Sequence, residues 1–164
     1  MEPEERFETP EDAANDPRIL VFGRLLGAAN RLEFILGAAI EAEAGIDHSL
    51  YELLLIVARA GDGGIAVRGI AQSRVLTSGG ATRLVQRAVA KGLVSRRTCP
   101  TDKRVQLIEL TPHGSEIVTT VSVIHARGIE RYLLDVLTAD QRVVFAEAVR
   151  AISKNAAAAL PVMP

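Results

Sequence analysis

The chain has 164 residues, 48% of them hydrophobic and 24% charged, with a formal net charge of −1, which fits one soluble globular domain with a sizeable core. Its longest apolar run, residues 156–162, is too short to span a bilayer, and its acidic first residues lack the apolar core of a signal peptide. A single cysteine excludes an internal disulfide, so we expect a cytoplasmic protein.

The first third of the chain predicts an arm and two helices. Residues 1–15 are acidic and are expected to form a flexible arm. Asp16 and Pro17 predict the start of a long helix that ends at Gly45, and Asp47 is expected to cap a second helix that ends at Gly61. The apolar stripe of the long helix is broader than one packing face needs, which predicts packing on two sides; it comprises Leu20, Val21, Phe22, Leu25, Leu32, Ile35, Leu36 and Ile40.

A short strand and a short helix are expected next. After a glycine-rich turn at residues 61–64, the strand lies near Ile65 and the helix near Ile70. Ala66 stands where a Ser or Thr cap is usual, and Gly69 inside the helix costs about 1 kcal/mol relative to Ala. The sequence therefore predicts a weakly held helix, followed by a turn at residues 75–77.

Residues 78–91 predict an amphipathic helix that Gly92 ends. One face carries Leu84, Val85, Ala88 and Val89, and the other carries Thr82, Arg83, Gln86 and Arg87. Gly79 and Gly80 have two readings: they loosen the start of the helix, or they let its backbone approach a phosphate, since helix N-termini favour anions.

A basic hairpin and two further helices complete the chain. A strand with Arg96 and Arg97 leads through a polar turn at residues 100–104 into an alternating strand at residues 105–110. Thr111 and Pro112 predict the start of a helix whose apolar stripe reaches Val136, and Thr138 to Gln141 match a capping box that opens the last helix.

Positive charge is concentrated in one segment. Residues 67–104 hold nine Arg or Lys and one acid, a net charge of +8, so that the remainder carries −9. Because local charge decides where a polyanion docks, this segment is the candidate contact surface for DNA.

At these residues the chain resembles the MarR family of bacterial winged helix-turn-helix transcriptional regulators. The family's wing signature, Asp-x-Arg, a strand ending in Leu-Thr, then x-x-Gly, stands here as Asp102-Lys103-Arg104, then Leu110-Thr111, then Gly114. Residues 81–87 and 91–94 resemble its recognition helix and the exit from that helix. The resemblance implies a mainly α fold with a small β-hairpin wing, and a double-stranded DNA partner.

The resemblance divides the chain into functional parts. We expect a flexible arm (1–15), an N-terminal dimerisation helix (16–46), a winged helix-turn-helix region (47–111), C-terminal dimerisation helices (112–158) and a tail (159–164). The long amphipathic helices at both ends of the sequence predict a homodimer with a self-complementary two-fold interface. We expect it to act as a repressor on an inverted-repeat operator.

Individual residues are assigned to DNA by their chemistry. Arginine pairs with guanine and glutamine with adenine in the major groove, which points to the exposed face of the recognition helix. The resemblance implies that the wing tip enters the minor groove. Arg104 is the expected contact because arginine suits a narrow, electronegative groove, and Asp102 is expected to orient Arg104 or another wing arginine. The predicted DNA-binding residues are Ser78, Thr82, Arg83, Gln86, Arg87, Arg96, Arg97, Lys103 and Arg104, some of which contact only phosphates.

The sequence leaves the signal open. The resemblance implies a small aromatic or anionic effector, but its site is unknown; Arg24, Asn30, Arg31, His48 and Tyr51 are more simply surface or packing residues. The absence of tryptophan argues against urate, and scattered histidines (His48, His113, His125) against a metal. We expect no cofactor and no catalytic residues, because no nucleophile–base pair or phosphate loop is found.

Two alternatives to a ligand-released repressor remain. One is a winged-helix module whose basic face binds an acidic protein, because fold does not fix function. The other is a redox-responsive regulator that uses Cys99, whose thiol pKa the neighbouring Arg96 and Arg97 are expected to lower.

Overall fold

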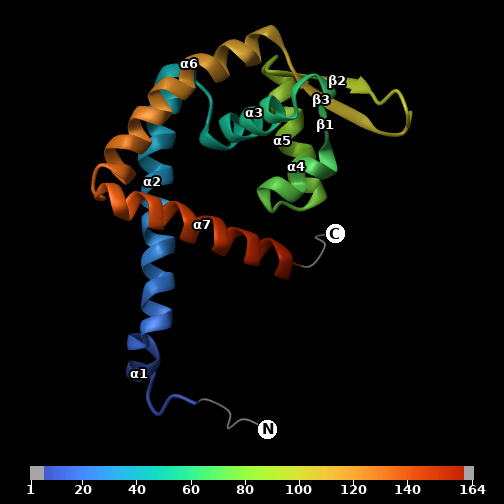
Figure 1. Cartoon of the computed structure of the whole chain (residues 1–164). Helices are drawn as coiled ribbons and strands as arrows, with labels where there is room; N and C mark the ends of the chain where they lie inside the picture. The colour runs from blue at the N-terminus through green and yellow to red at the C-terminus, as the bar shows by residue number, and fades with distance from the viewer. Residues whose placement is uncertain (1–5, 161–164) are drawn as a thin grey trace. The chain divides into compact units, whose positions relative to one another are not determined.

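The computed structural model describes residues 6–160 and is mainly helical (Figure 1). Contacts divide the chain into two compact units, residues 1–35 and 36–164. The first unit holds helix α1 (Pro10–Asn15) and most of α2 (Pro17–Ala44). The described part of the second unit contains the remainder of α2 and all later helices and strands, up to Leu160.

Helix α1 corrects the expected flexible arm. Residues 10–15 are helical because Thr9 caps them: the Thr9 side chain accepts a hydrogen bond from Asp12 N and Pro10 occupies the first turn. Residues 1–5 of the predicted arm lie outside the described residues, as do residues 161–164 of the predicted tail.

The predicted ends of α2 are confirmed. Asp16 Oδ1 accepts hydrogen bonds from the backbone N–H groups of Arg18 (2.8 Å) and Ile19 (3.4 Å), and Gly45 ends the helix with a φ of +63°. The hydrogen bond from the Arg18 side chain lowers the pKa of Asp16 to about 2. Leu36 and Ile40 of α2 are buried, whereas many apolar residues nearer its start are exposed.

Three helices and a short strand form the centre of the second unit. They are α3 (His48–Ala60), the 3-10 turn η1 (Gly61–Gly63), β1 (Ile65–Ala66), α4 (Val67–Arg74) and α5 (Ser78–Ala90). Asp47 caps α3 by accepting from Leu50 N, and Thr77 caps α5 by accepting from Gly80 N. Ala66 caps α4 without a side-chain acceptor, as the sequence predicts.

The turn between α4 and α5 contains an unusual backbone conformation. Val75 has φ 53° and ψ 45°, in the left-handed region, where a β-branched side chain is strongly disfavoured. Its conformation closes α4, because Leu76 N donates to Ala71 O at 2.9 Å. The direction of α5 therefore depends on a strained residue.

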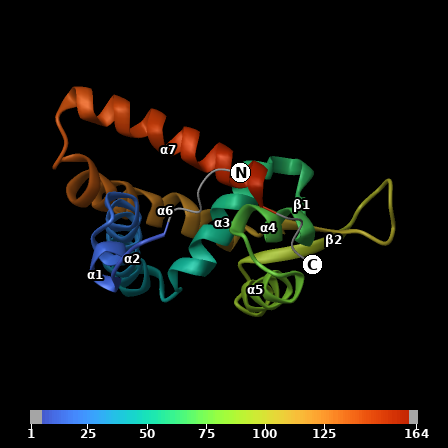
Figure 2. The ribbon, with the colours of Figure 1, turned by 90° about the horizontal axis from the view of Figure 1, so that it is seen from below.

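A three-stranded antiparallel sheet forms the wing, in the order β1-β3-β2. Strands β2 (Val94–Thr98) and β3 (Gln106–Leu110) pair with Arg96 opposite Ile108, and β1 pairs with the other edge of β3. Figure 2 shows the hairpin extending beyond α3, α4 and α5. Strand β3 begins one residue later than predicted, because Val105 N turns back to bond Asp102 O.

The C-terminal helices differ from the prediction at one place. Helix α6 (Pro112–Ile129) begins at the expected Thr111 cap, but residues Glu130–Leu134 form a π-helical segment, η2, in place of α-helix up to Val136. Asp135 N bonds Glu130 O at 2.8 Å, which is the wider π spacing. Helix α7 (Ala139–Ala159) begins with the predicted capping box of Thr138 and Gln141.

One hydrophobic core holds α3, α4, α5 and the sheet together. Its fully buried residues include Leu50, Leu53, Leu54, Ile70, Val85 and Ile108. The predicted inner face of α5 is buried at Leu84, Val85 and Ala88, but Val89 is exposed, because only part of the apolar stripe meets the core. Among the described residues, no helix is long and apolar enough to cross a membrane.

Candidate nucleic-acid interface

Helix α5 separates its apolar and polar residues cleanly. Ala81, Leu84, Val85 and Ala88 face the core, and this fixes the opposite side of the helix outward. The five predicted DNA-binding residues of this helix are all exposed: Ser78, Thr82, Arg83, Gln86 and Arg87. The structure therefore groups the predicted base-reading residues on one accessible face.

The start of α5 is ordered in spite of its two glycines. Thr77 Oγ1 accepts from Gly80 N at 3.1 Å, and Thr82 Oγ1 donates to Ser78 O at 2.8 Å. A Cβ on Gly80 would lie 3.2 Å from Thr77 Oγ1, so glycine there leaves room for the cap. Gly79 is open by comparison, since a Cβ would meet only Arg83 Nη1 at 3.9 Å.

Arg87 forms an ion pair with a distant residue, which the sequence analysis did not predict. Its Nη2 forms an ion pair with Asp47 Oδ2, while Asp47 Oδ1 caps α3. One turn later, Lys91 Nζ donates to Gly45 O at 3.4 Å. Arg87 of α5 and its C-cap residue Lys91 therefore hold the end of this helix against the turn between α2 and α3. Arg87 is less available to DNA than an unpaired arginine of the same face.

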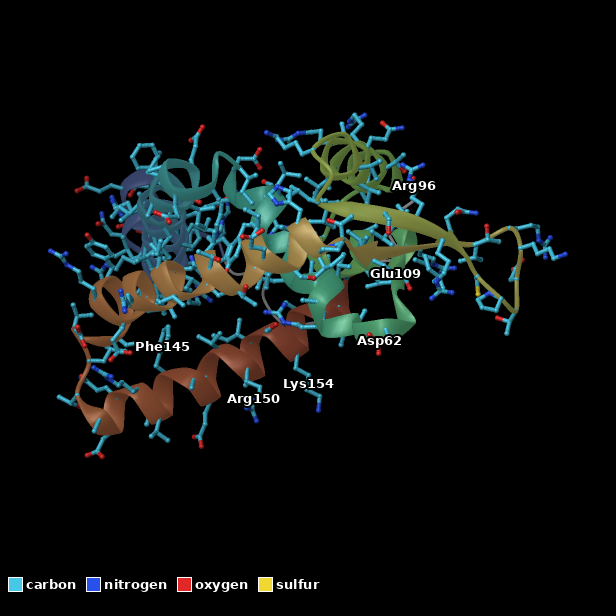
Figure 3. The ribbon with its side chains drawn as sticks, turned by 90° about the horizontal axis from the view of Figure 1, so that it is seen from above. Asp62, Arg96, Glu109, Phe145, Arg150 and Lys154 are labelled. Carbon is cyan, nitrogen blue, oxygen red and sulfur yellow. The ribbon has the colours of Figure 1, made fainter. Side chains whose placement is uncertain are left out.

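Strands β2 and β3 place two neighbouring arginines differently. Arg96 is exposed and lies on β2 next to α5, with Glu109 on the adjacent strand (Figure 3). Arg97 Nε and Nη2 both donate to Glu109 Oε1, at 2.9 and 2.7 Å. This pair lowers the pKa of Glu109 and raises that of Arg97. Arg96 is thus the more available of the two for a phosphate.

The wing tip shows the predicted Asp–Arg relationship. Asp102 Oδ1 accepts from Arg104 N at 3.0 Å and from Arg104 Nε at 3.4 Å, while the Arg104 side chain is 92% exposed. Lys103 is also exposed. The carboxylate therefore folds the turn and leaves the guanidinium of Arg104 on the surface of the tip.

These features agree with the comparisons. A family model described as the MarR family matches residues 44–105, which run from the end of α2 through the wing tip. In these residues and in its fold the chain is similar to the MarR family of transcriptional regulators. The predicted fold class, a mainly helical winged helix-turn-helix protein with a small antiparallel sheet, is confirmed.

A curated relative matches about two thirds of the chain. A regulator of Bacillus subtilis (strain 168), described as the uncharacterized HTH-type transcriptional regulator YdgJ, is 29% identical over 110 residues. This match covers 67% of the chain and 66% of the relative, just under two thirds of the relative's length.

Two solved MarR-family structures from Streptomyces coelicolor cover more. Sco3205, solved in complex with DNA, is 28% identical, with a TM-score of 0.78 over 93% of this chain and 91% of its own. AbsC shares the fold, with 19% identity and a TM-score of 0.77 over 92% of this chain and 97% of its own.

The family's Leu-Thr-x-x-Gly pattern has a steric reason in this chain. Thr111 Oγ1 donates to Gly92 O at 2.6 Å, and Thr111 N donates to Leu93 O at 3.1 Å. A Cβ on Gly114 would lie 1.9 Å from Leu93 O, so only glycine allows α6 to start against this turn. The pattern therefore locks the exit of α5 to the start of α6.

Two histidines that lie far apart in the sequence come into contact in the fold. The rings of His48 (α3) and His125 (α6) have centroids 5.7 Å apart, and Tyr51 packs edge-on against His125 at 5.1 Å. The Tyr51 hydroxyl bonds Ser122 Oγ at 2.7 Å. Burial and the charge of His48 lower the pKa of His125. Helical spacing alone could not predict this contact between α3 and α6. Among the described residues, no group of three or more His, Cys, Asp or Glu side chains could hold a metal ion.

The pKa of the Cys99 thiol is lowered, as expected, but its main cause differs from the expected one. The pKa of its thiol is lowered mainly by the hydrogen bond with Thr101, whose Oγ1 lies 3.3 Å from Sγ, and by backbone amides of the turn. The expected arginines, Arg96 and Arg97, are not the main cause of the lowered pKa. The remaining effector candidates from the sequence lie as follows: Tyr51 is buried packing, and Arg24, Asn30 and Arg31 are exposed on α2.

Proposed function

We propose that this chain is a homodimeric repressor of the MarR family that binds an inverted-repeat operator in the cytoplasm and is released by a small-molecule ligand. The observation that carries the DNA-binding part is the outward face of α5 beside a basic wing. Helices of this kind fit the major groove, and the relative Sco3205 was solved in complex with DNA.

We assign roles from exposure and pairing. Three side chains of α5 read base edges: Thr82, Arg83 and Gln86. All three are exposed, and none of them forms an ion pair with a described residue. Arg104 enters the minor groove, and Ser78, Arg96 and Lys103 hold phosphates. Arg87 and Arg97 reach DNA only by sharing their guanidinium groups with Asp47 and Glu109.

The proposed dimer would bury apolar residues that are exposed to water in a single chain. In the second unit these include Val123 of α6, and Val143, Val144 and Ile152 of α7, and in the first unit Val21, Phe22 and Phe34 of α2. Arg150 and Lys154 point away from α6, whereas Phe145 points toward it (Figure 3). A second copy of the chain offers matching surfaces, so we propose residues 16–46 and 112–158 as the dimerisation helices and 47–111 as the DNA-reading region.

The test is a titration of the purified chain against DNA fragments from its own genomic neighbourhood. We expect specific binding to an inverted repeat whose half-sites are about 10 base pairs apart, with affinity that falls as salt rises. Light scattering should give twice the mass of one chain. Binding that is equally weak for every DNA sequence, together with capture of one acidic protein, would favour the interaction-module alternative.

A further inference from the structure

Helix α4 ends differently from its neighbours in the chain. Helix α2 ends at Gly45 (φ +63°), α3 ends at Gly61 (φ +59°), and Gly92, just after α5, has φ +68°. Within residues 6–160, Val75 at the end of α4 is the one residue other than glycine with a positive φ, 53°. Glycine adopts this conformation without a steric cost, whereas a β-branched side chain is strained in it. A glycine at position 75 would therefore hold the same turn with less strain.

The turn after α4 uses the backbone of Val75 and leaves its side chain outside. Val75 N donates to Gln72 O at 3.4 Å, and Leu76 N donates to Ala71 O at 2.9 Å, which closes the helix. Leu76 packs against the hydrophobic core, whereas Val75 is 51% exposed and does not belong to the described core. Packing within the described chain therefore does not offset the strain, and strained residues of this kind cluster at binding sites.

The position of Val75 beside α5 indicates DNA as the molecule that its side chain contacts. Val75 lies two residues before Thr77, which caps α5, and three before Ser78, the first residue of that helix; both are exposed. In helix-turn-helix proteins the N-terminal residues of the recognition helix contact base edges, so the turn that leads into this helix lies at the edge of the groove. The apolar groups of DNA that a valine meets there are the C5-methyl group of thymine and the deoxyribose.

We propose that the Val75 side chain contacts an apolar group of the operator, a thymine methyl or a deoxyribose, at the edge of each half-site. This contact rests on the proposed function as an operator-binding protein, and it adds an apolar contact to the polar ones of Thr82, Arg83 and Gln86. Burial of the two Val75 methyl groups against DNA is favourable only in the complex. The strained turn therefore costs stability in the free chain and increases affinity for the operator.

Substitution of Val75 in the full chain separates the fold from the contact. Val75→Gly should raise the urea midpoint of unfolding, because glycine relieves the left-handed strain. The same variant should weaken operator affinity about fivefold or more, because the buried methyl groups are lost. Val75→Asn, which tolerates this conformation and is less flexible than glycine, should weaken operator affinity likewise. Val75→Ile keeps a branched apolar side chain and should bind the operator nearly as the wild type does.

Deoxyuridine in the operator distinguishes the two apolar groups, because it lacks the C5-methyl group of thymidine. Each thymine of a half-site is replaced in turn, and the affinities of the wild type and of Val75→Gly are compared. With a methyl contact, one replacement should weaken binding by the wild type and leave binding by Val75→Gly unchanged, which is a double-mutant cycle between protein and DNA. With a deoxyribose contact, Val75→Gly and Val75→Asn should bind weakly and no replacement should show this coupling.

The control variant is Val89→Ala, which shortens an exposed valine near the other end of α5 and should bind the operator as the wild type does. Wild-type operator affinity of Val75→Gly or Val75→Asn would overturn the contact. A lower urea midpoint of Val75→Gly would also overturn it, since the side chain would then serve the fold. A wild-type chain that discriminates no operator would refute the proposed function and the contact together, whereas discrimination that Val75→Gly retains in full would refute the contact alone.

Discussion

Asp47 pairs with Arg87 of α5 through one carboxylate oxygen while its other oxygen caps α3 at Leu50 N, 3.1 Å away. One side chain therefore orients two helices, and it does so through an arginine on the proposed DNA-reading face. Because the partners are 42% and 52% exposed, the pair contributes little stability by itself, but it determines where Arg87 points.

Substitution of Asp47 separates its two roles. Asp47→Asn keeps a good cap and removes the charge, so we expect a loss of under about 1 kcal/mol in the free energy of unfolding. Asp47→Ala removes both and should cost about 1–2 kcal/mol. Urea denaturation measures both. Asp47→Asn should also bind DNA of any sequence more tightly, because it frees Arg87 and removes a negative charge; unchanged non-specific affinity would show that the pair does not restrain Arg87.

Arg104→Ala tests the wing tip. The Arg104 side chain is 92% exposed, so its removal should leave folding and the proposed dimer unaffected. Operator affinity should fall about tenfold or more, in the range of one good base contact. A mobility-shift titration measures this, with light scattering as the control for the dimer. Wild-type affinity would exclude Arg104 as a DNA contact.

Arg83→Ala tests base reading by α5. Arg83 is exposed, and no ion pair with a described residue occupies it. We expect a loss of about 1–3 kcal/mol on the operator and a relaxed preference at one base pair. The measurement compares the operator with a set of single-base variants. A loss of the same size on every sequence would make Arg83 a phosphate contact only.

His125 predicts an acid-sensitive stability. Its pKa is lowered by burial first and by the charge of His48 second, so the folded chain resists protonation that the unfolded chain accepts. The stability contribution is full above the ordinary histidine pKa of about 6.5 and is lost as the pH falls below that value toward the lowered one. Thermal unfolding between pH 7.5 and 5.5 should show a smaller loss for His125→Gln than for the wild type. His113→Gln, an exposed histidine on the same helix, is the control and should behave as the wild type.

Much of the fold could be predicted because its signals are local. The four predicted caps, Asp16, Asp47, Thr111 and Thr138, each accept a hydrogen bond from a residue two or three positions away, which sequence spacing reveals. The wing turn is similarly local, since Asp102 and Arg104 are two residues apart.

The contacts that were missed join distant segments. Arg87 meets Asp47, and His125 meets His48, only because α5 and α6 pack against α3, and no spacing rule contains that information. Val89 continues the apolar stripe of α5 but is exposed, because a helix repeats its apolar positions beyond the area that its neighbour covers. The π segment at residues 130–134 likewise has no local signature in composition.

Gly114→Ala tests whether the family's glycine is structural. The added Cβ would lie 1.9 Å from Leu93 O and 2.9 Å from Leu93 C, both backbone atoms that cannot move aside alone. Moving the start of α6 would break the bonds from Thr111 to residues 92 and 93, so we expect a loss of about 3 kcal/mol or more in unfolding free energy. Gly79→Ala is the matched control, because its Cβ meets only the end of Arg83 and an alanine in a helix gains up to about 1 kcal/mol. Equal stability of Gly114→Ala and the wild type, measured by urea denaturation, would show that the α6 start can shift and that the glycine serves another purpose.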